Sequence, residues 1–213
     1  MSRCRTRLSR CKLLVPSSSI PIESVSMDDL SNRRVGPIRN CLFSIDGLSM
    51  VVAPDASRFV FRGKGAAHVA AGRAFGIDLP HHAFCTVARG TRTALWMGPD
   101  EWLLLGIVLE GVLIEAQLTE ALTGLAYSLV DVGHRDVAIE LSGAKAAATL
   151  NVGCPLDLHP SVFTTGLCKR TLLAKAEIVL WRKAPQVFHV QIRRSYSDYV
   201  WQFLEQAAGD ADT

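Results

Sequence analysis

Two segments of the sequence, residues 58–84 and 137–163, repeat one pattern 79 positions apart. Each segment predicts a short strand, then glycine and small residues that open an alanine-rich helix, and then a loop. Both loops contain Asp-Leu and end at a phenylalanine, Phe84 in the first copy and Phe163 in the second. The repeat therefore restricts the chain to an architecture of two similar halves, which we expect to share one core.

A strand pair and a closing helix are predicted after each copy. In the first half, Gly98-Pro99-Asp100-Glu101 has the residues of a tight turn between two strands. The expected strands are residues 93–97, 102–108, 170–174, 178–181 and 187–193, with a further strand pair at residues 126–132 and 135–141 between the halves. Helices are expected at residues 110–122 and 195–208, and Ser195 is the predicted N-cap of the second helix.

Adjacent strands with helices between them favour an α+β fold, in which a mostly antiparallel sheet carries helices on one side. The order of elements predicts two βαββα-like pseudo-repeats, at residues 41–124 and 125–208. We expect these repeats to form one domain at residues 36–208, followed by a short tail at residues 209–213.

The N-terminal residues 1–35 are rich in arginine and serine and lack apolar periodicity, so we expect a disordered basic tail. Two explanations fit this composition. Either the start codon is mis-called and the true chain begins at Met27, or the segment is an organelle transit peptide. The absence of an amphipathic helix pattern favours the mis-called start.

Charge and hydropathy exclude several classes of partner. The first 26 residues carry a net charge of +4 and the rest of the chain −1, so no basic field covers the body and nucleic acid is not an expected partner. The longest apolar run, residues 102–109, is far too short to span a membrane. The six cysteines form no C-x-x-C motif, and we expect reduced thiols and a cytoplasmic location.

No catalytic, cofactor-binding or metal site is expected from the motifs. The candidates are a phosphate loop at Gly63-Lys64-Gly65, metal ligands at His81, His82 and Cys85, and a catalytic pair at Asp131 and His134. The Gly-Lys-Gly segment is better explained as the start of a helix than as a phosphate site, because the second repeat has a similar segment at the same place. The histidines and the cysteine are too few for zinc, which needs about four ligands. The Asp-His pair has no nucleophile motif to act with, and its sequence favours a turn at Gly133.

Tryptophans flank the predicted Gly-Pro-Asp-Glu turn. Tryptophan is enriched at the centres of protein interfaces, and it is equally common in cores. Trp96, Pro99 and Trp102 are therefore the candidate residues for a subunit interface, and a core role for the two tryptophans stays open. Charged residues make up only 20% of the chain, which favours a surface partly covered by partners over a compact, simply aliphatic domain.

Several of these segments resemble, in order across residues 41–208, the gamma subunit family of heterotetrameric sarcosine oxidase. The segments that carry the likeness are ALWMGPDEWLLL at residues 94–105, LVDV at 129–132, GCPLDL at 153–158 with Phe163, Gly166, Arg170 and Thr171, and RRSY at 193–196 leading into Tyr199, Trp201 and Leu204. The Gly-Pro-Asp-Glu-Trp hairpin and the Cys-Pro-Leu-Asp-Leu loop are the most specific of them.

The resemblance implies a non-catalytic subunit of an oxidoreductase. Such a complex oxidatively demethylates sarcosine to glycine with release of hydrogen peroxide, and with tetrahydrofolate present the one-carbon unit leaves as methylenetetrahydrofolate. A related N-methyl amino acid as the substrate stays open. The alpha, beta and delta subunits would hold FAD, FMN, NAD, tetrahydrofolate and zinc, and this chain would bind no cofactor and dock chiefly on alpha. It also implies a fold similar to the folate-binding module of aminomethyltransferases.

Two other functions remain open from the sequence. The chain could be a stand-alone, folate-binding one-carbon (aminomethyl) transferase, as the same resemblance suggests. Such enzymes use an acidic residue just after the strand that corresponds to residues 170–174, whereas Lys175 and Ala176 follow it here and Glu177 begins another strand. The third possibility is a free-standing binding module.

Overall fold

The structure is a computed structural model, and it describes residues 42–210. The predicted tail at residues 1–35, with Met27, and the last three residues of the predicted tail at 209–213 lie outside this range.

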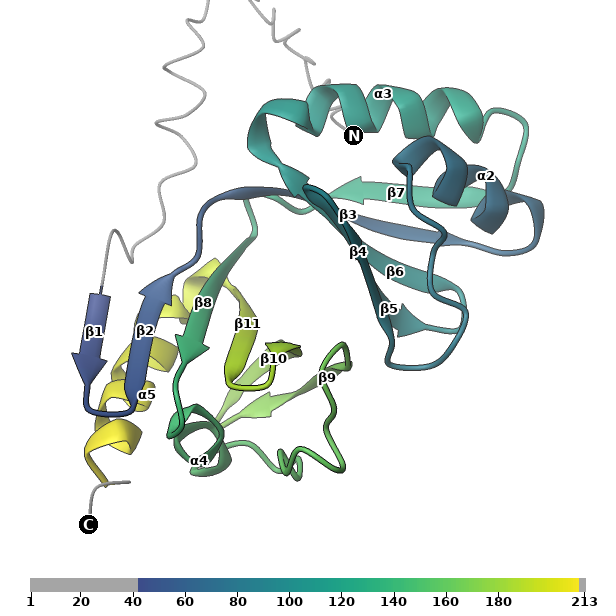
Figure 1. Cartoon of the computed structure of the whole chain (residues 1–213). Helices are drawn as coiled ribbons and strands as arrows, with labels where there is room; N and C mark the ends of the chain where they lie inside the picture. Colours follow the sequence, from purple (N-terminus) through teal and green to yellow (C-terminus); the bar gives the residue numbers. More distant parts are fainter. Residues whose placement is uncertain (1–41, 211–213) are drawn as a thin grey trace, which may run out of the picture. The chain divides into compact units, whose positions relative to one another are not determined.

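Five antiparallel strands form the first sheet. Their order is β4 (Thr86–Arg89), β5 (Arg92–Gly98), β6 (Glu101–Ile107), β3 (Ala56–Gly63) and β7 (Tyr127–Asp131). Helices α2 (Ala66–Phe75) and α3 (Gly111–Ala121) pack together on one face of this sheet, and a 3₁₀ turn at Val108–Glu110 leads into α3 (Figure 1). A core of apolar side chains from β3, β5, β6 and the two helices fills the space between them.

Six antiparallel strands form the second sheet. Their order is β1 (Leu42–Ile45), β2 (Leu48–Val52), β8 (Asp136–Ser142), β11 (Val187–Arg193), β10 (Ala176–Ala184) and β9 (Cys168–Leu173). Helices α4 (Ala146–Asn151) and α5 (Ser197–Asp210) pack against it over a second apolar core, and a 3₁₀ turn at Arg194–Tyr196 precedes α5.

The two sheets are equivalent in strand order, which confirms the predicted α+β fold with two pseudo-repeats. Each half runs strand, helix, three strands, helix, so that β3-α2-β4-β5-β6-α3 matches β8-α4-β9-β10-β11-α5. The strand beside β3 is β7 and the strand beside β8 is β2. The prediction missed β4 in the first half, which is only four residues long.

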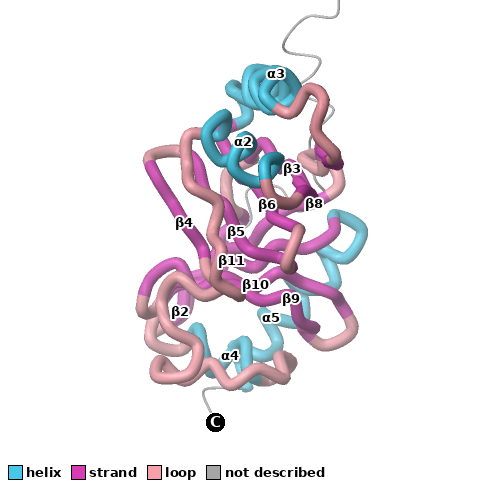
Figure 2. The backbone as a smooth tube through the Cα atoms, turned by 90° about the vertical axis from the view of Figure 1, so that its right-hand side faces the viewer, coloured by secondary structure: helices cyan, strands magenta, loops and turns pink. Residues whose placement is uncertain are grey.

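The sheets pack face to face over a third core. This core contains Leu95, Leu103, Leu105, Val132, Cys168 and Trp181. Strand β6 is buried on both faces for this reason, because Trp102 and Leu104 contact the helix layer while Leu103 and Leu105 contact the other sheet. Figure 2 shows the resulting order of layers, with α2 and α3 at one end, strands between, and α4 and α5 at the other end. The two halves therefore meet in this third cluster, but they do not share the one core that the sequence led us to expect, because each sheet also has a core of its own beneath its helices.

The two halves also join through their backbones. Cys85 and Leu167 form an antiparallel bridge just before β4 and β9. The amide of Thr86 donates to the carbonyl of Gly166 at 2.9 Å, and the amide of Cys168 donates to the carbonyl of Phe84 at 2.7 Å. Equivalent positions of the two repeats therefore contact each other at one junction.

Two local predictions were wrong. The expected strand pair at residues 126–132 and 135–141 does not pair, because β7 belongs to the first sheet and β8 to the second, and the Gly133 turn carries the chain from one sheet to the other. Ser195 is not a helix N-cap. It lies inside the 3₁₀ turn, and α5 begins at Ser197, whose hydroxyl donates to the carbonyl of Arg194 at 2.7 Å.

Candidate functional site

A hollow beside the β5–β6 hairpin gathers most of the residues that the sequence analysis singled out. Its volume is about 540 Å³. The lining residues are Gly63, Lys64, Gly65, His68, Val69, His81, Ala83, Trp96, Pro99 and Trp102. We call this site the hairpin hollow. The structure thus brings the three predicted interface residues together with the Gly-Lys-Gly segment and one histidine of the rejected metal site.

Trp102 forms the floor of the hairpin hollow rather than its rim. Its side chain is only 3% exposed, and its indole Nε1 donates a buried hydrogen bond to the carbonyl of Pro80 at 2.9 Å. The ring centroid lies 5.8 Å from that of Phe61 and 4.5 Å from that of His68. Trp102 is therefore a core residue of this chain, which was one of the two roles left open by the sequence.

The other two hairpin residues are more accessible. Trp96 is half-buried and its ring meets that of Phe84 edge-on at 5.3 Å, while Pro99 is exposed at the tip of the hairpin. The turn consists of Pro99 and Asp100, as predicted, because β5 ends at Gly98 and β6 begins at Glu101. Their role as an interface stays a prediction.

His68 also lines the hollow, and the sequence analysis did not single it out. It is 7% exposed, and its ring centroid lies 4.4 Å from that of His81 and 4.5 Å from that of Trp102, with the rings tilted in both pairs. Burial, followed by the charge of His81, lowers the pKa of His68, while a hydrogen bond to the backbone of Leu79 partly opposes the shift. The imidazole is therefore neutral near pH 7, and its Nε2 atom is buried without a hydrogen-bond partner.

The Gly-Lys-Gly segment begins α2, as the sequence predicted. Gly65 has φ of +53°, a conformation that glycine adopts without strain, and the helix starts at the next residue. No side chain caps this helix start, and its first turn contains no acidic residue. Lys64 is 76% exposed in its side chain, and its Nζ lies 3.6 Å from Oδ2 of Asp100.

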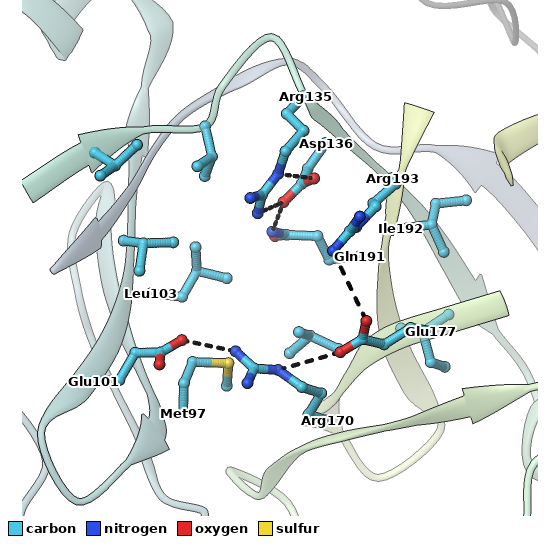
Figure 3. Close-up of a pocket in the computed structure, with 15 residues that line it drawn as sticks. Met97, Glu101, Leu103, Arg135, Asp136, Arg170, Glu177, Gln191, Ile192 and Arg193 are labelled. Atoms are coloured by element: carbon cyan, nitrogen blue, oxygen red, sulfur yellow. Dashed lines mark hydrogen bonds and ion pairs between the residues drawn. The ribbon is translucent and has the colours of Figure 1, made fainter. Parts of the chain in front are cut away.

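A second cavity, of about 330 Å³, lies between the two sheets, and we call it the intersheet cleft (Figure 3). Apolar side chains such as Val60, Leu103 and Ile192 line its walls. On one side, Arg170 of β9 contacts Glu101 of β6 at 2.7 Å and so links the two sheets. A further ion pair joins Glu177 to Arg170 at 3.7 Å.

The other side of the cleft is built around Asp136. Arg135 Nε donates to Oδ1 of Asp136 at 2.9 Å, and Gln191 Nε2 donates to Oδ2 at 3.0 Å. The hydrogen bond to Asp136 raises the pKa of Arg135. Each guanidinium that lines the cleft, including Arg193 at 4.0 Å from Glu177, faces a carboxylate. The charges therefore balance one another and connect neighbouring strands.

The other residues that the sequence analysis considered for catalysis stabilise turns or pair with neighbouring charges. Asp131 Oδ1 accepts a hydrogen bond from the amide of Gly133 at 2.7 Å, which is the predicted turn. Within residues 42–210, no group of three or more His, Cys, Asp or Glu side chains is arranged to hold a metal ion. Glu177 lies in β10 opposite Leu172, where it pairs with arginines of the cleft.

None of the helices in the described range is long and apolar enough to cross a bilayer.

Comparison with known proteins decides the family. Residues 62–210 match the model of the sarcosine oxidase, gamma subunit family. The chain belongs to this family. A relative in the gamma subunit family is the sarcosine oxidase subunit gamma of Arthrobacter sp, which is 34% identical over 144 residues, covering 67% of this chain and 70% of the relative.

Solved structures agree with this gamma-family assignment. The fold is similar to a chain of the heterotetrameric sarcosine oxidase from Corynebacterium sp. U-96, with a TM-score of 0.73 and 25% identity over 78% of this chain and 86% of that chain. It is also similar to aminomethyltransferase T of the glycine cleavage system from Bartonella henselae, with a TM-score of 0.59 and 10% identity over 74% of this chain and 45% of that one. The second likeness concerns the fold alone.

Proposed function

We propose that this chain is the gamma subunit of a heterotetrameric sarcosine oxidase and that its role is to assemble with and stabilise the subunits that carry out the reaction. The observation that carries the proposal is the likeness to the Corynebacterium complex, which extends over 86% of a chain of that enzyme. In this role the chain is an accessory part of an oxidoreductase that converts sarcosine to glycine with release of hydrogen peroxide and formation of methylenetetrahydrofolate.

The proposal assigns the chemistry to other subunits. We infer that alpha, beta and delta subunits hold FAD, FMN, NAD, tetrahydrofolate and zinc, and that alpha is the main contact of this chain in the cytoplasm. We further propose residues 36–208 as the part of the chain that assembles. The balanced ion pairs of the intersheet cleft support a structural role, because each arginine there already faces a carboxylate.

Exposed apolar side chains support the docking role. At the start of α3, Leu109 is 85% exposed, Val112 is 83% exposed and Leu113 is 53% exposed. Trp96 and Pro99 add apolar surface at the β5–β6 hairpin. Large exposed apolar areas mark interaction sites, and a permanent subunit interface typically buries about 2,000 Å² or more. We propose that the hairpin, with Trp102 supporting it from the core, belongs to this interface.

Co-expression with the flavin-bearing subunits tests the proposal. We expect the tagged chain to co-purify with them in a fixed ratio, and we expect omission of the chain to lower the yield of the complex while the activity per bound flavin stays the same. Hydrogen peroxide release in the presence of sarcosine measures that activity. A chain that purifies alone, with no flavin-bearing partner, would contradict the proposal.

A further inference from the structure

The equivalence of the two sheets breaks at the outer edge of β7. In the second sheet, β8 is followed outward by β2 and then by β1, which pairs antiparallel with β2 (Figure 1). In the first sheet, β3 is followed outward by β7, and within residues 42–210 the sheet ends there. No described strand of the first sheet therefore takes the position that β1 has in the second.

Half of the backbone groups of β7 point outward from this edge. The amide of Val132 donates to the carbonyl of Arg58 at 2.8 Å, which continues the antiparallel ladder between β7 and β3 by one hydrogen-bonded pair. Hydrogen-bonded and non-hydrogen-bonded pairs alternate along such a ladder, so the amides and carbonyls of Ser128 and Val130 point to β3. The residues whose amides and carbonyls point away from β3 are Tyr127, Leu129 and Asp131.

The side chains along this edge are accessible and mostly apolar. Leu129 packs against the core beneath α2 and α3, whereas Val130 lines the intersheet cleft. Because side chains alternate along a strand, Tyr127 lies on the same face as Leu129. Tyr127 is 37% exposed and Val130 is 50% exposed, so each face of β7 has an apolar side chain that a neighbouring strand would cover.

The residues of β7 include none of the features that usually prevent strand addition. Exposed edge strands commonly contain lysine, other charged residues or proline, or are very short. The edge strand β9 contains Lys169 and Arg170, and the edge strand β4 has four residues and ends at Arg89. Strand β7 has the sequence YSLVD, and its one charged side chain, Asp131, accepts a hydrogen bond from the amide of Gly133. An edge of this kind favours pairing with another strand.

We propose that an extended segment of the partner subunit adds to the edge of β7 as a sixth, antiparallel strand of the first sheet, with apolar side chains beside Tyr127 and Val130. The outward amides and carbonyls select an extended backbone, because a strand supplies the matching acceptors and donors at the same spacing. The position of β1 in the second sheet shows that this architecture accommodates a strand there. The partner subunit is favoured over a second copy because the proposed assembly combines this chain with alpha, beta and delta subunits. This inference rests on the proposed function, since it names how the chain docks.

Hydrogen exchange of single amides in the assembled complex tests the added strand. We expect the three outward amides, those of Tyr127, Leu129 and Asp131, to exchange at least about tenfold more slowly than the amide of Thr91, after correction for intrinsic rates. Thr91 is the reference because it is exposed in the turn between β4 and β5. Exchange of the three amides at the rate of Thr91 would overturn the inference.

Two substitutions at the edge test its part in binding. Tyr127→Pro removes an outward amide at the first residue of the strand, a position where proline is tolerated, and Tyr127→Ala is its control, because it removes the same ring and keeps the amide. Val130→Lys places a charge on the edge, and its control is Val162→Lys, at a position of similar exposure in the second half. Thermal unfolding checks that the four variants fold like the unchanged chain.

The binding assay is the dissociation constant between each labelled chain and the purified flavin-bearing subunits. We expect Tyr127→Pro to bind at least about tenfold more weakly than Tyr127→Ala, and Val130→Lys at least about tenfold more weakly than Val162→Lys. Equal affinities within each pair would overturn the inference while leaving the proposed function intact. Failure of the unchanged chain to bind would overturn the proposed function itself.

Two other occupants of the edge are distinguished in the same complex. Two copies of this chain in the complex by native mass spectrometry, with exchange protection of β7 that depends on both, would assign the edge to a second copy. Loss of that protection when residues 1–34 are removed, with the complex still assembled, would assign it to the chain's own N-terminal segment. Either result would overturn the inference of a partner strand.

Discussion

We expect the substitution Trp102→Ala to lower the unfolding free energy of the chain, because Trp102 is a core residue and not an exposed interface residue. The side chain is 3% exposed, and truncation of a buried tryptophan costs about 3–5 kcal/mol of unfolding free energy. Of this, about 1–3 kcal/mol comes from the buried carbonyl of Pro80, which loses the donor at 2.9 Å. Because a domain is stable by only about 5–15 kcal/mol, the loss is a large share of the total.

Urea unfolding of the isolated chain, followed by far-ultraviolet circular dichroism, measures this effect. We expect Trp102→Ala to shift the midpoint strongly and Trp102→Phe, which keeps most of the ring but not the donor, to shift it by a smaller amount. Trp96→Ala serves as the comparison, because Trp96 is half-buried and its loss should affect assembly more than folding. An unchanged midpoint for Trp102→Ala would refute the placement of this ring in the core.

Two further predictions concern the second sheet. Gly143→Ala should lower the unfolding free energy, measured by urea titration, by more than about 1 kcal/mol, because φ at this residue is +120° and an added Cβ would collide with the backbone of Gly47. Gly209→Ala is the control: a Cβ added there would meet no atom within 4 Å, so this substitution should not destabilise the chain. Burial, with the charges of Arg58 and Lys183, lowers the pKa of His189 to about 3. Below pH 6.5 the unfolded chain therefore binds a proton at His189, whereas the folded chain does not. The unfolding free energy should decrease by up to about 1.4 kcal/mol per pH unit as the pH is lowered from 6.5 to 3, and His189→Gln should make this decrease smaller.

The repeated pattern was sufficient to predict most of the strands and helices, because strand and helix periodicity is a local property, but it missed β1, β2 and β4. It could not assign strands to sheets. The segments that became β7 and β8 are neighbours in sequence and alternate as a hairpin would, yet tertiary packing places them in separate sheets on either side of the Gly133 turn. The β1–β2 hairpin was overlooked although Asp46-Gly47, with φ of +77° at the glycine, is a strong turn signal between two apolar runs.

The residues of the candidate site, like the fold, could be predicted from the sequence only in part. The sequence identified Trp96, Pro99 and Trp102 from residue type and turn chemistry, but composition cannot decide whether a tryptophan faces a core or a partner. His68 lies in an alanine-rich segment, and the Gly63-Lys64-Gly65 motif before it did not mark the histidine itself as a candidate. Its importance depends on Trp102 and His81, which long-range pairing brings to within 4.5 and 4.4 Å of it. No local pattern encodes such a contact.

Native mass spectrometry of complexes captured through this chain in its own host would measure its assembly most directly. A single species that contains one copy of this chain together with flavin-bearing subunits is the expected result. Recovery of the lone polypeptide, and turnover of sarcosine by it without any other protein, would show that the chain does its work unaided.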